Sequence, residues 1–213
     1  MTQPSLLAAG VALLGILWLG PLPTLAQRHF SAHMTMHMGV VAVAAPLLAL
    51  GAAGGRLDLA RRFPRLFSPV PASAAELVIV WAWHAPVLHH AARSGAAALV
   101  TEQGMFLLAG LLVWMASLGG DARAGGARAG SGVVALLLTS MHMTLLGALL
   151  ALSSRPLYAH TSGGGPAGLD DQHLGGAIML LVGGLSYLAG GLGLSAALLK
   201  ARARTVAERQ GVR

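Results

Sequence analysis

Long apolar segments separated by short polar stretches run along almost the whole chain. Six of them reach the length of about 20 residues that a membrane-spanning helix needs. They lie at residues 5–26, 30–51, 73–92, 98–118, 132–153 and 173–199. Helices are expected because lipid offers no hydrogen-bond partners to the backbone of an open sheet. The sequence therefore predicts an all-α, polytopic transmembrane helical bundle, formed as a single domain over residues 1–213.

The composition agrees with a membrane protein. Of the 213 residues, 55% are hydrophobic and only 10% are charged, whereas soluble domains carry roughly 25% charged residues. This excludes a soluble globular enzyme and a disordered chain. The chain has no cysteine, which excludes disulfides, thiolate zinc sites, iron–sulfur clusters and thiol catalysis. The net charge of +7 does not indicate nucleic-acid binding, because the basic residues lie in short clusters between apolar segments.

The basic clusters orient the predicted bundle. If the N-terminus is cytoplasmic and the six helices alternate, 11 of the 14 basic residues fall on the cytoplasmic side, including those of a basic tail at 200–213. Only Arg28, Arg93 and Arg155 fall outside. By the positive-inside rule we expect both termini in the cytoplasm, with the arginine clusters against anionic lipid.

The first apolar segment could also be a cleaved signal peptide. It ends in Thr24-Leu25-Ala26, which resembles a signal-peptidase site, but residues 1–4 lack the positive charge usual in signal peptides. An uncleaved first helix is favoured, and cleavage would leave five helices.

The nine histidines avoid every predicted cytoplasmic loop and the tail. His29, His33 and His37 are spaced i, i+4, i+8 and share one helix face. His37, His84 and His142, on three different helices, are each expected roughly 12–16 Å below the outer surface. Ionisable residues inside a membrane are costly, so the His33–His37 pair predicts a functional site rather than packing alone.

Methionines accompany the histidines on two of the predicted helices. Met34, Met36 and Met38 alternate with the first group. Met141 and Met143 flank His142 but lie about 200° apart on a helix, so at most one can join it at a single site. Thioether sulfur suits Cu(I), and imidazole suits copper in general, although methionine also fills gaps in helical bundles. The mixture predicts a copper site, with copper as Cu(I), on the outer side.

Other polar residues allow a functional and a structural interpretation. His84 lies two residues before Pro86, which would kink the helix. The kink could open a cavity beside His84, or it could merely bend a helix at the membrane interface. His89 and His90 are expected near the lipid headgroups, solvated. Asp171 and His173 begin the last predicted helix, where the helix dipole favours a carboxylate. An acidic entry for cations or a docking surface for a partner would fit there equally well.

Two further carboxylates lie on predicted helices. Glu102 begins the fourth predicted helix near the outer surface, where the same dipole argument applies. Glu76 lies near the cytoplasmic end of the third and is interpreted as a topological residue. The predicted metal ligands are His33, His37, His84, His142, His173, Met34, Met36, Met38, Met141, Met143 and Asp171.

A set of short motifs occurs in one order along the chain. They are His33-Met34-x-x-His37-Met38, Ala45-Pro46-Leu47-Leu48-x-Leu50-Gly51, Trp83-His84-x-Pro86, Glu102 with Phe106-Leu107-x-x-Gly110-Leu111-Leu112-x-Trp114, Leu152-Ser153 with Pro156-Leu157-Tyr158, and Asp171-Gln172-x-Leu174-Gly175-Gly176-x-Ile178-Met179. Over roughly residues 29–185 the chain resembles the CtaG family of cytochrome c oxidase assembly factors, known from the caa(3)-type oxidase of bacteria. It differs in having six predicted helices rather than seven, and in having Leu180 where a tryptophan often stands.

The resemblance implies a multi-pass protein of the bacterial inner (plasma) membrane that is needed to mature a haem–copper oxidase, at its copper centres. It implies cytochrome c oxidase subunits and periplasmic copper chaperones as partners. The family's polar positions correspond here to His33, His37, His84, Glu102, Asp171 and Gln172.

Four functions remain open at this point. The first is a copper-handling assembly factor, and the second is a copper transporter, which would need polar residues through the inner half as well. The third is a b-type haem protein with ligands among His37, His84 and His142, and the fourth is an escort without metal. Enzymatic activity is not expected, because the chain has no nucleophile elbow, no His-Glu-x-x-His and no P-loop.

Overall fold

A computed structural model describes residues 3–120, 125–158 and 166–211. Within these ranges every regular element is helical, which confirms the all-α prediction. The elements are α1 (Pro4–Leu19), α2 (Leu22–Ala26), α3 (Phe30–Met38), η1 (Gly39–Ala44), α4 (Ala45–Ala52), α5 (Leu59–Arg62), α6 (Pro69–His84), α7 (Pro86–Ser94), α8 (Ala96–Leu118), α9 (Gly125–Ala151), α10 (Pro166–Ile178), η3 (Met179–Gly183) and α11 (Gly184–Gly211). The segments η1 and η3 are π-helical and continue the helices on either side.

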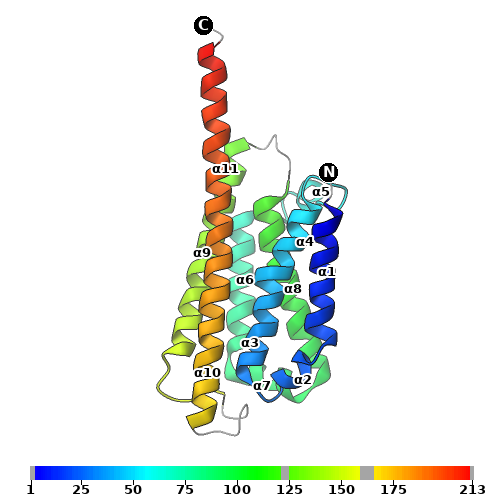
Figure 1. Cartoon of the computed structure of the whole chain (residues 1–213), viewed down its shortest axis with the longest axis vertical. Coiled ribbons are helices and arrows are strands. Elements are labelled where there is room, and N and C mark those ends of the chain that lie inside the picture. The colour runs from blue at the N-terminus through cyan, green and yellow to red at the C-terminus, as the bar shows by residue number, and fades with distance from the viewer. Residues whose placement is uncertain (1–2, 121–124, 159–165, 212–213) are drawn as a thin grey trace.

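The long helices make this a multi-pass membrane protein. Four of the described helices are long and apolar enough to cross a bilayer: Phe30–Ala52, Ala96–Leu118, Gly126–Ala151 and Ala167–Arg204. The bent pair α6 and α7 would be a fifth, whereas α1 is apolar but has only 16 residues. Helix α1 begins and α11 ends at the same end of the bundle (Figure 1). The count of six spans and the cytoplasmic position of the termini stay predictions.

The third predicted helix is broken near its C-terminal end. Helices α6 and α7 meet at Ala85 and are bent by 70° relative to each other. Ala85 is extended (ψ 133°) because the ring of Pro86 disfavours the α conformation in the residue before it. Pro86 is then well placed as the first residue of α7, where no N–H is needed. As a result α7 lies across the end of the bundle and packs against α8 (Figure 1).

The first and last apolar segments also differ from their predicted limits. The first is divided into α1 and α2 at Gly20 and Pro21. The last begins at Pro166 and continues to Gly211, so the basic tail extends the helix instead of following it. Lys200, Arg202 and Arg204 are exposed on this part of α11, which projects beyond the other helices (Figure 1).

Glycines let the central helices approach closely. A Cβ added to Gly147 of α9 would lie 2.9 Å from the carbonyl oxygen of Gly176 in α10, and one added to Gly176 would lie 2.8 Å from the carbonyl oxygen of Gly147. Likewise, a Cβ on Gly110 of α8 would lie 3.2 Å from the Cα of Val41. Lipid is as apolar as the helix surfaces, so such backbone-to-backbone packing is a main source of cohesion in a membrane bundle.

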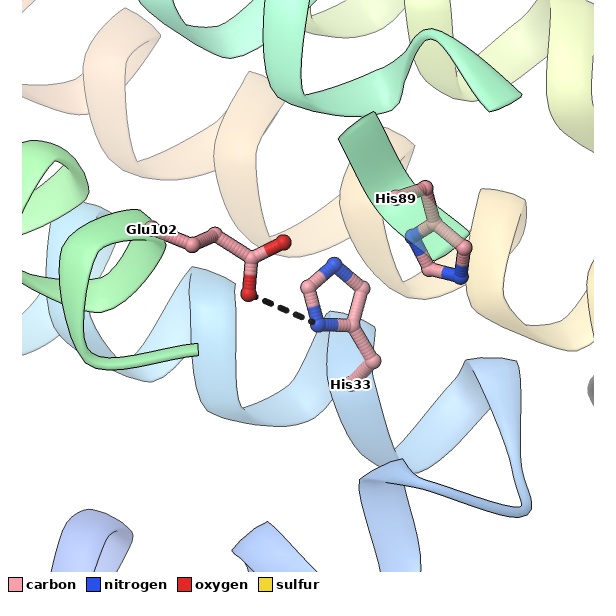
Figure 2. Close-up of side chains that lie close together, drawn as sticks. All are labelled: His33, His89 and Glu102. Carbon is pink, nitrogen blue, oxygen red and sulfur yellow. Dashed lines mark ion pairs between the residues drawn. The ribbon is translucent and has the colours of Figure 1, made fainter. Parts of the chain in front are cut away.

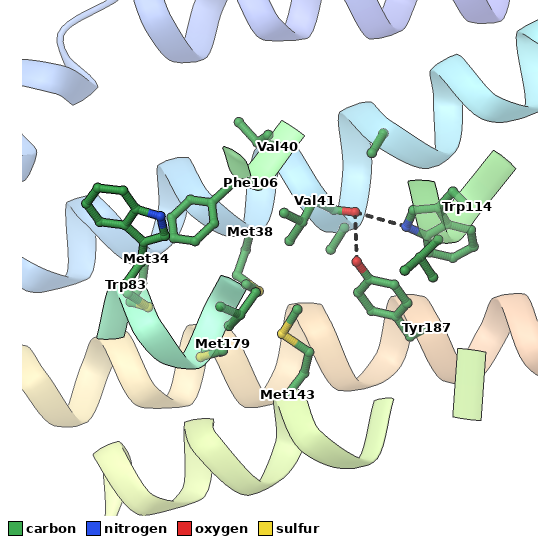
Figure 3. Packing of buried hydrophobic residues seen from close by; sticks show 14 of the residues in the cluster. Met34, Met38, Val40, Val41, Trp83, Phe106, Trp114, Met143, Met179 and Tyr187 are labelled. Carbon is green, nitrogen blue, oxygen red and sulfur yellow. Dashed lines mark hydrogen bonds between the residues drawn. The ribbon is translucent and has the colours of Figure 1, made fainter. Parts of the chain in front are cut away.

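Glu76 is a core residue and not a topological one, which corrects the interpretation from sequence. Its side chain is fully buried, and Tyr187 of α11 donates a hydrogen bond to its Oε1 at 2.5 Å. The carbonyl oxygen of Val41, in η1, accepts from Tyr187 (3.2 Å) and from Trp114 (3.0 Å), as Figure 3 shows. These bonds tie α6, α8 and α11 to the span that contains η1.

Asp171 fastens α10 to the beginning of α3. Its Oδ2 accepts the backbone N–H of Phe30 at 2.6 Å, and its Oδ1 accepts from the backbone N–H and the hydroxyl of Ser31. The first N–H groups of a helix have no partners inside the helix and carry partial positive charge. Asp171 therefore serves as a helix cap supplied from another helix.

Replacing this cap should destabilise the bundle. We expect Asp171→Ala to lose about 1–2 kcal/mol, the usual effect of removing a capping carboxylate, and to lower the apparent melting temperature in detergent. The neighbouring Asp170 is exposed, so Asp170→Ala is the matched control and should melt like the unmodified protein. Equal melting of the two variants would contradict the capping role.

Candidate metal centre

Four buried histidines come together near the end of the bundle that carries α7. We call His33, His37, His84 and His89 the histidine cluster. His33 and His37 lie one turn apart on α3, His84 ends α6 and His89 lies on α7. The ring centroids of His33 and His89 are 5.0 Å apart, and those of His37 and His84 are 5.4 Å apart. All four side chains are at most 5% exposed, so the cluster is an interior feature.

A carboxylate from α8 reaches His33 and His89 of this cluster. Glu102 is fully buried, and its Oε2 lies 3.7 Å from Nδ1 of His33. One ligand atom each from His33, His89 and Glu102 can be chosen so that all lie within 4.8 Å of one another. Figure 2 shows these three side chains converging from three different helices. Among the described residues, they form the single group of three or more histidine and acidic side chains with this spacing.

Most imidazole nitrogens of the cluster have no hydrogen-bond partner. The unpartnered buried atoms are Nε2 of His33, both ring nitrogens of His37, Nε2 of His84 and both ring nitrogens of His89. Buried polar atoms in proteins are normally hydrogen-bonded. Imidazole nitrogens are good ligands for transition metals, so the donor set and its unused nitrogens fit a metal ion.

Arg93 lies against the same group. It is one turn beyond His89 on α7, and its side chain is 6% exposed. Its guanidinium contacts Oε2 of Glu102 at 2.5 Å and Nδ1 of His33 at 2.6 Å. Because arginine is always protonated and can only donate, Nδ1 of His33 accepts this bond. Arg93 therefore bridges His33 and Glu102.

Aromatic rings cover the cluster on its outer side. Tyr158 stacks on Phe30 with centroids 4.6 Å apart, and its ring lies 4.3 Å from that of His89. The Tyr158 hydroxyl donates to the carbonyl oxygen of His84 at 2.8 Å. Burial raises the pKa of this phenol above its ordinary value, so the hydroxyl keeps the proton it donates. Gln172 accepts the backbone N–H of Leu157 at 2.7 Å and holds this covering segment in place.

The comparison with known protein families assigns the chain. Residues 3–201 match the family described as cytochrome c oxidase caa3 assembly factor (Caa3_CtaG). The chain belongs to this family. No curated protein and no solved structure matches it. Membership confirms the resemblance inferred from the motifs and supports a role in assembling a caa3 oxidase, which implies contact with cytochrome c oxidase.

Three of the expected nitrogen and oxygen ligands of this CtaG-family protein lie outside the cluster. His142 is buried on α9 with neither ring nitrogen partnered, but its ring contacts none of the four cluster rings. His173 is half-buried and bonds the carbonyl oxygen of Ser153 through Nε2 at 2.8 Å. Asp171 caps α3. Of the three imidazoles expected at one depth, the fold brings His37 and His84 together and leaves His142 apart.

The methionines divide into three environments. Met34, Met38 and Met143 are buried in the hydrophobic core, together with Met179, which was not among the expected ligands (Figure 3). Gly183 makes room for two of them, since a Cβ there would lie 3.1 Å from the sulfur of Met38 and 3.4 Å from Cβ of Met143.

The other two expected methionines point elsewhere. Met36 is buried on a different side of α3, where it lines an apolar cavity of about 370 Å³ with Trp18 and Gln103. Met141 is 63% exposed on the outside of the bundle. The angle of about 200° between Met141 and Met143 thus places Met143 inside and Met141 outside.

His89 and Arg93 are two residues at the candidate site whose positions the sequence did not predict. His89 was expected to be solvated, but the 70° bend turns α7 inward and buries it, while His90 stays exposed. Arg93 was counted only as a basic residue outside the cytoplasm. The signal in the sequence was the spacing of four residues between His89 and Arg93, which puts both on one face of a helix that starts at Pro86.

Losing one partner of the Arg93–Glu102 pair should destabilise the protein more than losing both. Glu102→Gln leaves a buried guanidinium without its counter-charge, and breaking a buried ion pair from one side costs about 3–5 kcal/mol. We expect this variant to unfold at a clearly lower temperature in detergent. The double variant Arg93→Gln/Glu102→Gln removes both charges and should recover part of the loss. A single variant as stable as the unmodified protein would show that the pair is not buried as described.

Proposed function

We propose that this protein binds copper as Cu(I) in the inner membrane of a bacterium and delivers it to a haem–copper cytochrome c oxidase during assembly. The observation that carries the proposal is the buried group of His33, His89 and Glu102, with ligand atoms within 4.8 Å. His37 and His84 adjoin it with unpartnered ring nitrogens. Copper is here a cargo, and the protein's own role is binding and transfer without catalysis.

The ligand types favour copper over other metals. The chain offers imidazole and thioether but no thiolate, and Met38 directly follows His37 in the sequence and is buried. Soft thioether ligands suit Cu(I). Several donors with unused nitrogens lie within one cluster, so a bound ion can exchange one ligand for another. Exchange of this kind is what a carrier needs.

The position of the cluster suits transfer on the periplasmic side. It lies toward the end of the bundle where α7 crosses (Figure 1), which is the end that the charge distribution predicts to face outward. There it could receive copper from a periplasmic copper chaperone and pass it to an oxidase subunit in the same membrane.

Metal analysis of neighbouring histidine variants tests the copper proposal. We expect the unmodified protein, purified in detergent after loading with Cu(I), to retain copper. His89→Ala should lose most of it, because His89 is buried in the group, whereas His90→Ala should retain it, because His90 is exposed on the same helix. Equal, near-zero copper in all three proteins would refute the proposal. A Soret band in the same preparations would instead indicate the b-type haem protein.

Oxidase maturation tests delivery separately from binding. In cells that lack the native gene, the double variant His33→Ala/His37→Ala should still co-purify with oxidase subunits, while the oxidase it accompanies should be deficient in copper. Fully metallated oxidase in these cells would favour an escort without metal. Copper uptake into sealed vesicles that contain the unmodified protein would favour the transporter.

A further inference from the structure

Arg93 places a fixed positive charge beside the proposed metal group, which consists of His33, His89 and Glu102. Its guanidinium lies 2.5 Å from Oε2 of Glu102 and 2.6 Å from Nδ1 of His33. These are two of the three side chains that could share an ion. The same guanidinium nitrogen that contacts His33 also donates to the carbonyl oxygen of Ala26 at 3.4 Å. Arg93 thus has a second acceptor and can stay buried beside the group when His33 turns its nitrogen to an ion.

The charges around the group sum to zero before any ion enters. Glu102 supplies one negative charge, Arg93 supplies one positive charge, and the imidazoles that act as ligands must be neutral. No second carboxylate belongs to the group among the residues that the structure describes. A monovalent ion therefore leaves one excess positive charge, and a divalent ion leaves two.

Excess charge is costly at this position. Glu102 is fully buried and Arg93 nearly so, within a bundle that crosses a membrane. Uncompensated charges inside a membrane protein are expensive, and two like charges a few ångströms apart repel strongly in a low-dielectric interior. Without Arg93, the carboxylate would offset one charge of an entering ion. With Arg93 paired to it, that offset is lost.

We propose that Arg93 is a specificity-determining residue of this centre: by neutralising Glu102 it restricts the group to a monovalent soft ion and rejects divalent ions such as Zn²⁺ and Cu²⁺. This inference rests on the proposed copper site and names the charge class of the ion it takes. It also explains why an arginine lies between two metal-ligating side chains, where a neutral residue would interfere less with binding.

A series of variants that changes the charge of the group one unit at a time tests this inference. Glu102→Gln makes the empty group positive, the unmodified protein and the double variant Arg93→Gln/Glu102→Gln keep it neutral, and Arg93→Gln makes it negative. Affinities for Ag⁺, a soft monovalent ion that replaces Cu⁺ in air, and for Zn²⁺ are measured on each protein in detergent. The quantity compared is the ratio of the Zn²⁺ affinity to the Ag⁺ affinity.

We expect the ratio of Zn²⁺ affinity to Ag⁺ affinity to be lowest in Glu102→Gln, intermediate in the two neutral proteins and highest in Arg93→Gln. Each unit of charge should change it by about tenfold or more. Arg93→Lys keeps the charge and should keep the ratio of the unmodified protein. Arg28→Gln changes an exposed arginine just before α3 and should also leave the ratio unchanged. The double variant keeps the test valid if Arg93→Gln alone fails to fold, because it and Glu102→Gln still differ by one charge.

The outcomes separate the two proposals. If the unmodified protein binds Ag⁺ but the ratio is the same in all variants, Arg93 does not determine specificity, and the copper site stands. If the ratio follows side-chain volume rather than charge, so that Arg93→Lys behaves like Arg93→Gln, the inference also fails. If the unmodified protein and every variant bind neither ion, the metal site itself is refuted, and the inference with it.

Discussion

The bend between α6 and α7 is the constraint on which the candidate centre depends. Pro86 forces the backbone of Ala85 out of the helical conformation, and the following helix turns by 70°. A straight helix would carry His89 and Arg93 outward to the lipid headgroups. The bend instead lays α7 against α8, so that His89 and Arg93 meet His33 from α3 and Glu102 from α8 (Figure 2).

The elements next to α7 are linked to one another by a chain of contacts. The carbonyl oxygen of His84, just before the break, accepts the Tyr158 hydroxyl, and the Tyr158 ring stacks on Phe30. Phe30 begins α3, whose first turn is held by Asp171 of α10. Residues that looked like separate polar motifs in the sequence therefore support one another. Asp171 and Gln172 act through α3 and the covering segment, His33 and His84 belong to the histidine cluster, and Glu102 lies beside His33.

The ion pair and the unpartnered imidazoles of the site are energetically costly because they are buried. A charged pair inside a membrane bundle is strongly destabilising if either partner is lost, and it often contributes little net stability when intact. The Arg93–Glu102 pair is therefore hard to explain as a device for stability. The same applies to the unpartnered ring nitrogens of His33, His37, His84 and His89, since buried polar atoms without partners are a cost unless something binds them. The proposed metal cargo would give both features one physical explanation.

The helical segments, the membrane class and the shared helix face of His33 and His37 were predictable from sequence, because they depend on local composition and on the helical period. The family was predictable from its motifs. The hydrophobic stretch at 30–51 corresponds closely to Phe30–Ala52, and the i, i+4 spacing places both histidines on one buried face.

The partners of these histidines could not be predicted. Whether His89 or His90 enters the core, whether Met141 or Met143 faces inward, and whether His142 joins His37 all depend on how each helix is rotated and bent against its neighbours. Those rotations are decided by contacts between segments far apart in the chain, such as Gly147 with Gly176 and Tyr187 with Glu76. Periodicity assigns a residue to a face of its own helix, but only tertiary packing decides what that face meets.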